Sequence, residues 1–145
     1  MTENIIIKPS VQKRFDSFME HGRVLFFSAP CGLGKTVLAD ALLRGRNVLR
    51  RNAGEPDCAI PSSTRDWDIL LIDDLQFMQE EARQQALCEL IRSSPEQRFV
   101  LLSRGTPPGC LVAFQYTGLM TVLNVEDLLF DREDIRRLLQ ACGAA

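Results

Sequence analysis

The sequence predicts a three-layer α/β/α sandwich around a central, mostly parallel sheet, and three observations support this fold class. Short runs of continuous apolar residues alternate along the chain with segments in which apolar residues recur at helical spacing. Continuous apolar runs are typical of parallel strands that are covered on both faces. Several of these runs end in polar or charged residues, as expected where the strands of an open α/β sheet meet a ligand.

The expected elements follow one another in chain order. Residues 1–22 are expected to hold an extended segment and a helix that Ser10 caps, with Gly22 ending it. Residues 23–145 are expected to form the rest of a single domain. The expected strands are residues 23–28, 47–51, 69–72, 98–103 and 119–125. The expected helices are residues 35–44, 80–91 and 111–116, with a final helix that Asp131 caps.

Residues 29–36, Ala-Pro-Cys-Gly-Leu-Gly-Lys-Thr, lie between the first expected strand and the next expected helix. Glycine turns the backbone without a Cβ penalty, so that successive N–H groups converge on phosphate oxygens at the helix N-terminus. In this pattern Lys35 places its charge between the β- and γ-phosphates, and the Thr36 hydroxyl ligates Mg²⁺. The strict pattern begins with glycine, and here Ala29 stands in that position.

We therefore expect the chain to bind a nucleotide, ATP or ADP, together with Mg²⁺. The chain has no Asn-Lys-x-Asp element, which argues against the GTPase pattern. The residues expected to contact the nucleotide are Ala29, Pro30, Cys31, Gly32, Leu33, Gly34, Lys35, Thr36 and Val37.

Two carboxylates, Asp73 and Asp74, follow the apolar run of residues 69–72. Asp73 is expected to hold Mg²⁺ together with Thr36, and Asp74 to orient or deprotonate the attacking water. Taken alone, an acidic pair after a strand is equally consistent with a helix N-cap. The phosphate-loop pattern upstream favours the magnesium interpretation.

Arg104 follows the strand expected at residues 98–103. An arginine at the end of a strand beside the phosphate loop stabilises the transferring charge or reports whether a third phosphate is present. The alternative is a solvated loop arginine. The residues expected to take part in catalysis are Lys35, Asp74 and Arg104.

Composition agrees with one soluble domain. The chain has 145 residues, of which 46% are hydrophobic, enough for one core. Its formal net charge of −2 gives no overall attraction to nucleic acid. Its five cysteines have irregular spacing, typical of reduced thiols and not of a disulfide framework or a zinc site. The absence of a signal peptide and of a membrane span predicts a cytoplasmic protein.

The chain resembles the nucleotide-binding domain of STAND-class signal-transduction ATPases, closest to the large LuxR-family regulators of the maltose-regulator type. The resemblance implies a P-loop NTPase core with strand order 5-1-4-3-2, in which ATP favours an open, oligomerising state and ADP a closed one. It also implies further domains of a longer regulator, absent here, through which alone DNA would be bound. The resemblance to this family rests on residues 28–36, 71–74, 102–104, 107–108, 118–119 and 126–130.

Because the sequence lacks the modules that close over the nucleotide in such regulators, we expect the isolated core to be monomeric, to bind nucleotide weakly and to hydrolyse it little. Asp74 is also shorter by about one methylene than the glutamate of faster ATPases of this class, so slow hydrolysis is expected.

Two other interpretations remain open. Residues 70–77, Leu-Leu-Ile-Asp-Asp-Leu-Gln-Phe, resemble the carboxylate strand of replication initiators, which would make the chain an initiator- or loader-type AAA+ ATPase acting on DNA. A degenerate domain that serves as a protein-binding platform is the non-enzymatic alternative. Intact Lys35, Thr36, Asp73 and Asp74 argue against it.

Overall fold

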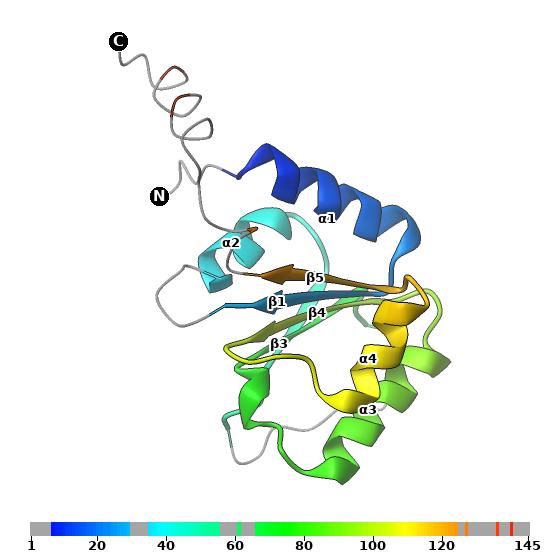
Figure 1. The fold of residues 1–145 in the computed structure, drawn as a ribbon. Helices are drawn as coiled ribbons and strands as arrows, with labels where there is room; N and C mark the ends of the chain where they lie inside the picture. The colour runs from blue at the N-terminus through cyan, green and yellow to red at the C-terminus, as the bar shows by residue number, and fades with distance from the viewer. Residues whose placement is uncertain are drawn as a thin grey trace.

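The computed structural model describes residues 7–29, 35–55, 61, 66–124, 127, 136 and 140, and its strands and helices form an α/β arrangement around a single sheet (Figure 1). Five strands make one sheet, and helices lie on its two faces. The strands are β1 (Val24–Ser28), β2 (Val48–Asn52), β3 (Ile69–Asp73), β4 (Arg98–Ser103) and β5 (Met120–Asn124). The helices are α1 (Pro9–His21), α2 (Lys35–Leu42), the 3₁₀ turn η1 (Leu75–Phe77), α3 (Glu81–Ser93) and α4 (Gly109–Tyr116).

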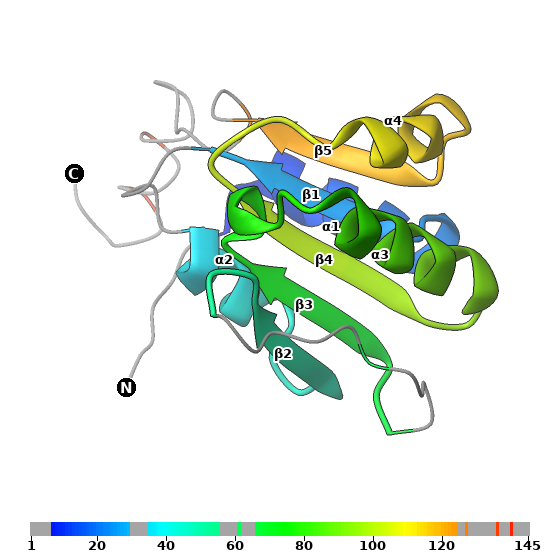
Figure 2. The ribbon, with the colours of Figure 1, turned by 90° about the horizontal axis from the view of Figure 1, so that it is seen from below.

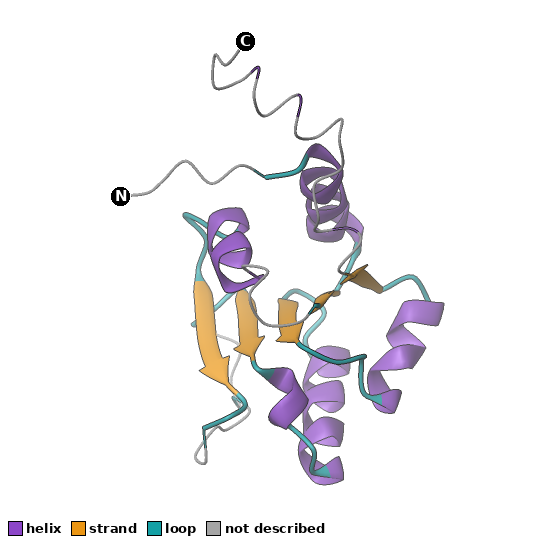
Figure 3. Cartoon of the chain, turned by 60° about the vertical axis from the view of Figure 1, so that its left-hand side comes forward, coloured by secondary structure: helices purple, strands orange, loops and turns teal. Residues whose placement is uncertain are grey.

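The strands lie in the order β2-β3-β4-β1-β5, and every neighbouring pair is parallel. This is the predicted order read from the opposite edge, so the fold prediction is confirmed. In particular, β4 lies between β1 and β3, as predicted for the strand that precedes Arg104. Because the strands run in one direction (Figure 3), their carboxyl ends meet at one edge of the sheet. Ser28 is level there with Ser103 and with Asn124.

Two hydrophobic cores flank the sheet. In Figures 1 and 2, α1 and α2 lie on one face, and α3 and α4 lie on the other. Strand β1 shows why its sequence is apolar without interruption. Its side chains alternate between faces, so that Val24 and Phe26 belong to the α3–α4 core while Leu25 and Phe27 belong to the α1–α2 core. All four are fully buried, as expected for a central strand.

Helix α1 begins two residues earlier than the sequence predicted. Lys8 occupies the N-cap position without a side-chain cap, and Pro9 is the first helical residue. The predicted cap by Ser10 is therefore wrong, because proline has no N–H to satisfy and its fixed φ suits the first helical position. Gly22 follows the helix, as predicted. The final helix capped by Asp131 lies outside the described residues.

Helix α1 is attached to the segment around β5. The Arg14 guanidinium donates to the Val122 carbonyl at 3.0 Å and pairs with the Asp127 carboxylate at 3.0 Å. Asp127 also accepts a hydrogen bond from the Asn124 amide at 2.8 Å. These contacts fix the N-terminal helix to the edge of the sheet that β5 forms.

Arg23 joins the start of β1 to the end of α3. Its guanidinium donates to the carbonyls of Gln97 at 3.1 Å and Ile91 at 2.6 Å, and also to that of Ser94. Burial, and then the nearby charge of Arg98, lower the pKa of Arg23. The Ile91 and Ser94 carbonyls also accept backbone hydrogen bonds, so the guanidinium adds charge-assisted contacts that tie the end of α3 to the start of β1.

We expect Arg23→Ala to lower the free energy of unfolding by about 2–3 kcal/mol, because it removes charge-assisted hydrogen bonds to three carbonyls. Chemical denaturation measures this change directly. The matched control is Arg44→Ala, which removes an exposed arginine and is expected to change stability by less than about 0.5 kcal/mol. Equal effects of the two substitutions would contradict the role given to Arg23.

In the part of the chain that the structure describes, no helix has both the length and the apolarity needed to cross a bilayer.

Candidate nucleotide-binding site

The two residues predicted to hold Mg²⁺ meet at the carboxyl edge of the sheet. Thr36 is the second residue of α2, and Asp73 is the last residue of β3. The Thr36 hydroxyl donates a hydrogen bond to Asp73 Oδ2 at 3.1 Å. The other oxygen of this carboxylate, Oδ1, accepts from the Asp74 amide at 2.8 Å. Two segments 37 residues apart in the sequence thus bring a hydroxyl and a carboxylate together.

These oxygens suit magnesium. Mg²⁺ is a hard cation that takes oxygen ligands, keeps several waters and uses only one or two protein groups together with substrate phosphates. The adjoining oxygens of Thr36 and Asp73 fit this donor set. When bound, the ion would neutralise charge on the phosphate oxygens.

Lys35 lies at the first turn of α2, next to the phosphate-loop segment. Its Nζ donates to the Ala29 carbonyl at 2.6 Å, and the Ala29 amide donates to the Ser103 carbonyl at 3.1 Å. Ala29 is buried, whereas half of the Val37 side chain is exposed. The remaining predicted contacts, Pro30, Cys31, Gly32, Leu33 and Gly34, lie outside the described residues.

Asp74 is held in an unusual backbone conformation by two side-chain amides. Its φ of 55° and ψ of 41° are left-handed, and among the described residues it alone of the non-glycines has a positive φ. Aspartate tolerates this region better than most residues, because its short polar side chain bonds locally. Asp74 Oδ2 accepts from the Asn52 amide at 3.2 Å, and Oδ1 accepts from the Gln76 amide at 3.3 Å.

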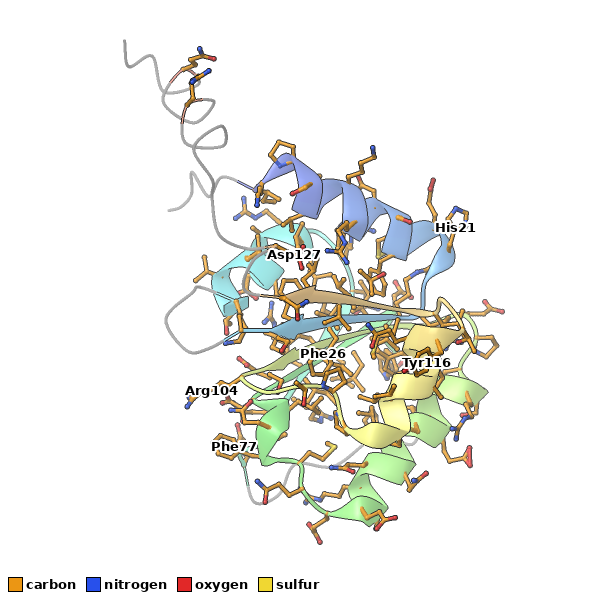
Figure 4. All side chains as sticks on the ribbon, in the orientation of Figure 1. His21, Phe26, Phe77, Arg104, Tyr116 and Asp127 are labelled. Carbon is orange, nitrogen blue, oxygen red and sulfur yellow. The ribbon has the colours of Figure 1, made fainter. Side chains whose placement is uncertain are left out.

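Gln76 connects Asp74 to the end of β4. Its Oε1 accepts a hydrogen bond from the backbone amide of Arg104 at 3.0 Å. The Arg104 side chain is exposed at the end of the molecule where the strands finish, on the same side as Phe77 (Figure 4). The carboxylate and arginine segments, predicted separately, are thus joined through a single glutamine.

Asn52 and Gln76 are site residues that the sequence analysis missed. The expected strand at 47–51 ended one residue before Asn52, which in the structure is level with Asp73 across the β2–β3 pair. Asn52 also accepts from the Gly54 amide at 2.7 Å, so both ends of its side chain are engaged. The available sequence signals were the amide residue Asn52 at the end of β2 and the amide residue Gln76 in η1, shortly after β3.

A cavity of about 550 Å³ lies elsewhere, where the strands begin. Its lining mixes both signs of charge, with Arg46 and Arg98 facing it beside Asp68 and Glu96. Because Asp68 and Arg98 precede or start β3 and β4, this cavity is at the opposite edge from the phosphate-loop segment. It is not the predicted nucleotide site.

Comparisons with solved structures find the same fold in a helicase and in ORC. A Pif1 helicase from Bacteroides matches with a TM-score of 0.55 and 13% identity, covering 93% of this chain and 46% of that chain. A second Bacteroides Pif1 structure, in complex with ADP-AlF4, matches with a TM-score of 0.52 and 15% identity over the same shares of the two chains. The fold is that of a P-loop NTPase.

A further match is to Drosophila ORC bound to AT-rich DNA and Cdc6, with a TM-score of 0.51 and 11% identity, covering 90% of this chain and 63% of that chain. The chain thus spans about half of the Pif1 chain and less than two thirds of the ORC chain. No protein-family model and no curated protein matches the sequence. At these identities the likeness concerns the fold alone.

Proposed function

We propose that this chain is the ATP-binding, slowly hydrolysing nucleotide-switch domain of a signal-responsive transcriptional regulator in the cytoplasm. The observation that carries the nucleotide part is the contact of Thr36 with Asp73 at the carboxyl edge of a P-loop sheet. The nucleotide complex of Bacteroides Pif1, which has the same fold, supports it. The regulatory part rests on the resemblance of the sequence to STAND-class domains.

Each site residue has a role in this proposal. Lys35 and the backbone of residues 29–34 hold the phosphates, and Thr36 and Asp73 hold Mg²⁺. Asp74 orients the attacking water, and Arg104 contacts the terminal phosphate, so that the presence of this phosphate alters the end of β4. A differential contact of this kind is what a nucleotide switch requires.

We base slow hydrolysis on the length of the Asp74 side chain, which is about one methylene shorter than the glutamate of faster ATPases of this class. The Asn52 and Gln76 amides hold its two oxygens, so the orientation of the carboxylate depends on these hydrogen bonds. Hydrolysis that is slow compared with binding keeps the ATP state populated long enough to act as a signal.

We expect Asp73→Asn to weaken binding of Mg²⁺–ATP by about tenfold while leaving binding of metal-free ATP unchanged, since an amide is a poorer magnesium ligand than a carboxylate. Titrations with magnesium and with EDTA measure the two affinities. Asp68→Asn, an exposed aspartate just before the same strand, is the matched control. An equal loss with and without magnesium would contradict the metal role of Asp73.

We expect Gln76→Ala to lower the single-turnover rate of ATP hydrolysis by about tenfold, because Asp74 loses an orienting hydrogen bond and its link to Arg104. Nucleotide affinity should stay within about twofold, since Gln76 contacts the backbone amide of Arg104 and not the side chain proposed to reach the phosphate. Gln85→Ala, on the exposed face of α3, is the control. A loss of affinity equal to the loss of rate would show that Gln76 supports the fold of the site instead.

The second candidate function is an initiator- or loader-type AAA+ ATPase that acts on DNA. Its support is the likeness to Drosophila ORC, whose structure holds DNA and Cdc6, together with the sequence of residues 70–77. Hydrolysis measured with and without duplex and single-stranded DNA separates the two. Stimulation by DNA favours the second candidate, and an unchanged rate favours the switch domain.

A further inference from the structure

Two cysteines from different helices meet on the face of the sheet away from α1. Cys88 lies in the middle of α3 and is fully buried, and Cys110 is the second residue of α4 and is partly exposed. They are separated by 22 positions in the sequence. Helices α3 and α4 pack side by side in the structure (Figures 1 and 2).

Their thiols are neighbours. The Cys110 side chain is close enough to Cys88 to contribute to the rise in its pKa. Cys110 Sγ also donates to the Gln84 carbonyl at 3.7 Å. Gln84 and Cys88 are four residues apart and therefore lie on one face of α3, so Cys110 lies against the helix turn that ends at Cys88. A disulfide needs the two sulfurs at about 2 Å and the two Cβ atoms within about 4.5 Å, so closure requires the two neighbouring thiols to rotate toward each other.

The two thiols differ in reactivity. Burial raises the pKa of Cys88 to about 12, and the proximity of Cys110 adds to this. Cys88 is therefore a neutral thiol at pH 7, and the thiolate is the reactive form. Cys110 is the sulfur that solvent and a small oxidant reach first.

We propose that Cys88 and Cys110 are a modification site at which a reversible disulfide forms and staples α3 to α4. With glutathione disulfide as oxidant, the Cys110 thiolate attacks one glutathione sulfur, forming a mixed disulfide and releasing one glutathione thiolate. Cys88 then gives its proton to solvent and attacks the Cys110 sulfur, which releases the second glutathione. Two protein thiols are oxidised to a disulfide, and glutathione disulfide is reduced to two glutathiones.

A disulfide between α3 and α4 would link the two helices that follow the two halves of the candidate site. Helix α3 follows the segment that carries Asp74 and Gln76, and α4 follows the loop that carries Arg104. The thiol pair itself stands apart from these residues. The proposal therefore does not depend on nucleotide binding, and its test can fail or succeed independently of the proposed function.

Peptide mapping after incubation with glutathione disulfide at pH 8 tests the proposal. Trypsin cleaves after Arg83, Arg92, Arg104 and Arg132, so that Cys88 lies in peptide 84–92 and Cys110 in peptide 105–132. We expect these two peptides to be linked, to separate on reduction, and the intact protein to melt higher by about 5–10 °C when linked. Glutathione that stays on Cys110 without closure, or linkage of Cys110 to another cysteine, would overturn the proposal.

Two variants and the pH dependence sharpen this test. Cys110→Ser removes the partly exposed partner with little change to the core, and it should abolish the linked peptide and the rise in melting temperature. Cys142→Ser, the control, should preserve both.

Closure of the disulfide should accelerate by about tenfold per pH unit between pH 7 and 9, since the thiolate fraction of Cys88 rises by that factor well below its pKa. A closure rate independent of pH would contradict the assignment of Cys88 as the slow, buried partner.

Discussion

Lys35→Ala is expected to weaken the binding of both ATP and ADP by at least about 100-fold, because charge-assisted contacts to phosphate contribute about 1.5–3 kcal/mol each. In the structure the Lys35 ammonium lies at the first turn of α2 and is held by the Ala29 carbonyl, at the start of the phosphate-loop segment. Titration with a fluorescent ADP analogue measures the affinity.

The control is Lys13→Ala, which removes an exposed lysine on α1. It should leave the affinity within about twofold of the unmodified protein, since Lys13 is a solvent-exposed charge outside the predicted set of nucleotide contacts and salt screens such charges. Binding that survives Lys35→Ala would mean that the nucleotide occupies a different part of the surface.

Asp74→Asn is expected to slow ATP hydrolysis by about 100-fold, because a positioned general base contributes about 10²–10⁴ to the rate. Nucleotide affinity should change by less than about threefold, since the substitution keeps the size of the side chain and Asp73 still holds the metal. Single-turnover hydrolysis with protein in excess over ATP measures the rate, even for a slow enzyme.

The matched control is Asp16→Asn on the exposed surface of α1. If Asp74→Asn hydrolyses ATP at the unaltered rate, Asp74 does not act on the water. Its hydrogen bonds with Asn52 and Gln76 would then serve only to hold the ends of β2, β3 and β4 together.

The order of the strands was predictable because the sequence marks each central strand strongly. Strands β1, β3 and β4 are buried on both faces, so they appear as uninterrupted apolar runs, and the polar residues that end them lie at one edge. The pairing of Thr36 with Asp73 followed from the same pattern. A parallel sheet brings the residue after one strand and the start of the next helix to the same edge.

The contacts around Asp74 were not predictable in this way. Asn52 reaches Asp74 only because β2 and β3 pair in the register that places Asn52 level with Asp73, and local sequence patterns do not specify register between distant strands. The left-handed backbone of Asp74 likewise depends on the turn η1, which is too short to have a periodic signal.

The proximity of Cys88 and Cys110 was likewise not predictable from the sequence. In the sequence, Cys88 and Cys110 are two of five irregularly spaced cysteines. Only the packing of α3 against α4 brings them close together. Local pattern thus predicted the elements and their order, whereas contacts between side chains of different elements required the structure.

The most direct test of the proposed nucleotide site is a calorimetric titration of the unmodified protein with ATP and with ADP, each in the presence of Mg²⁺. We predict saturable binding of one nucleotide per chain, weakened when EDTA removes the metal. A protein that unfolds cooperatively yet gives no binding heat with either nucleotide at several temperatures would contradict a functional site in this chain.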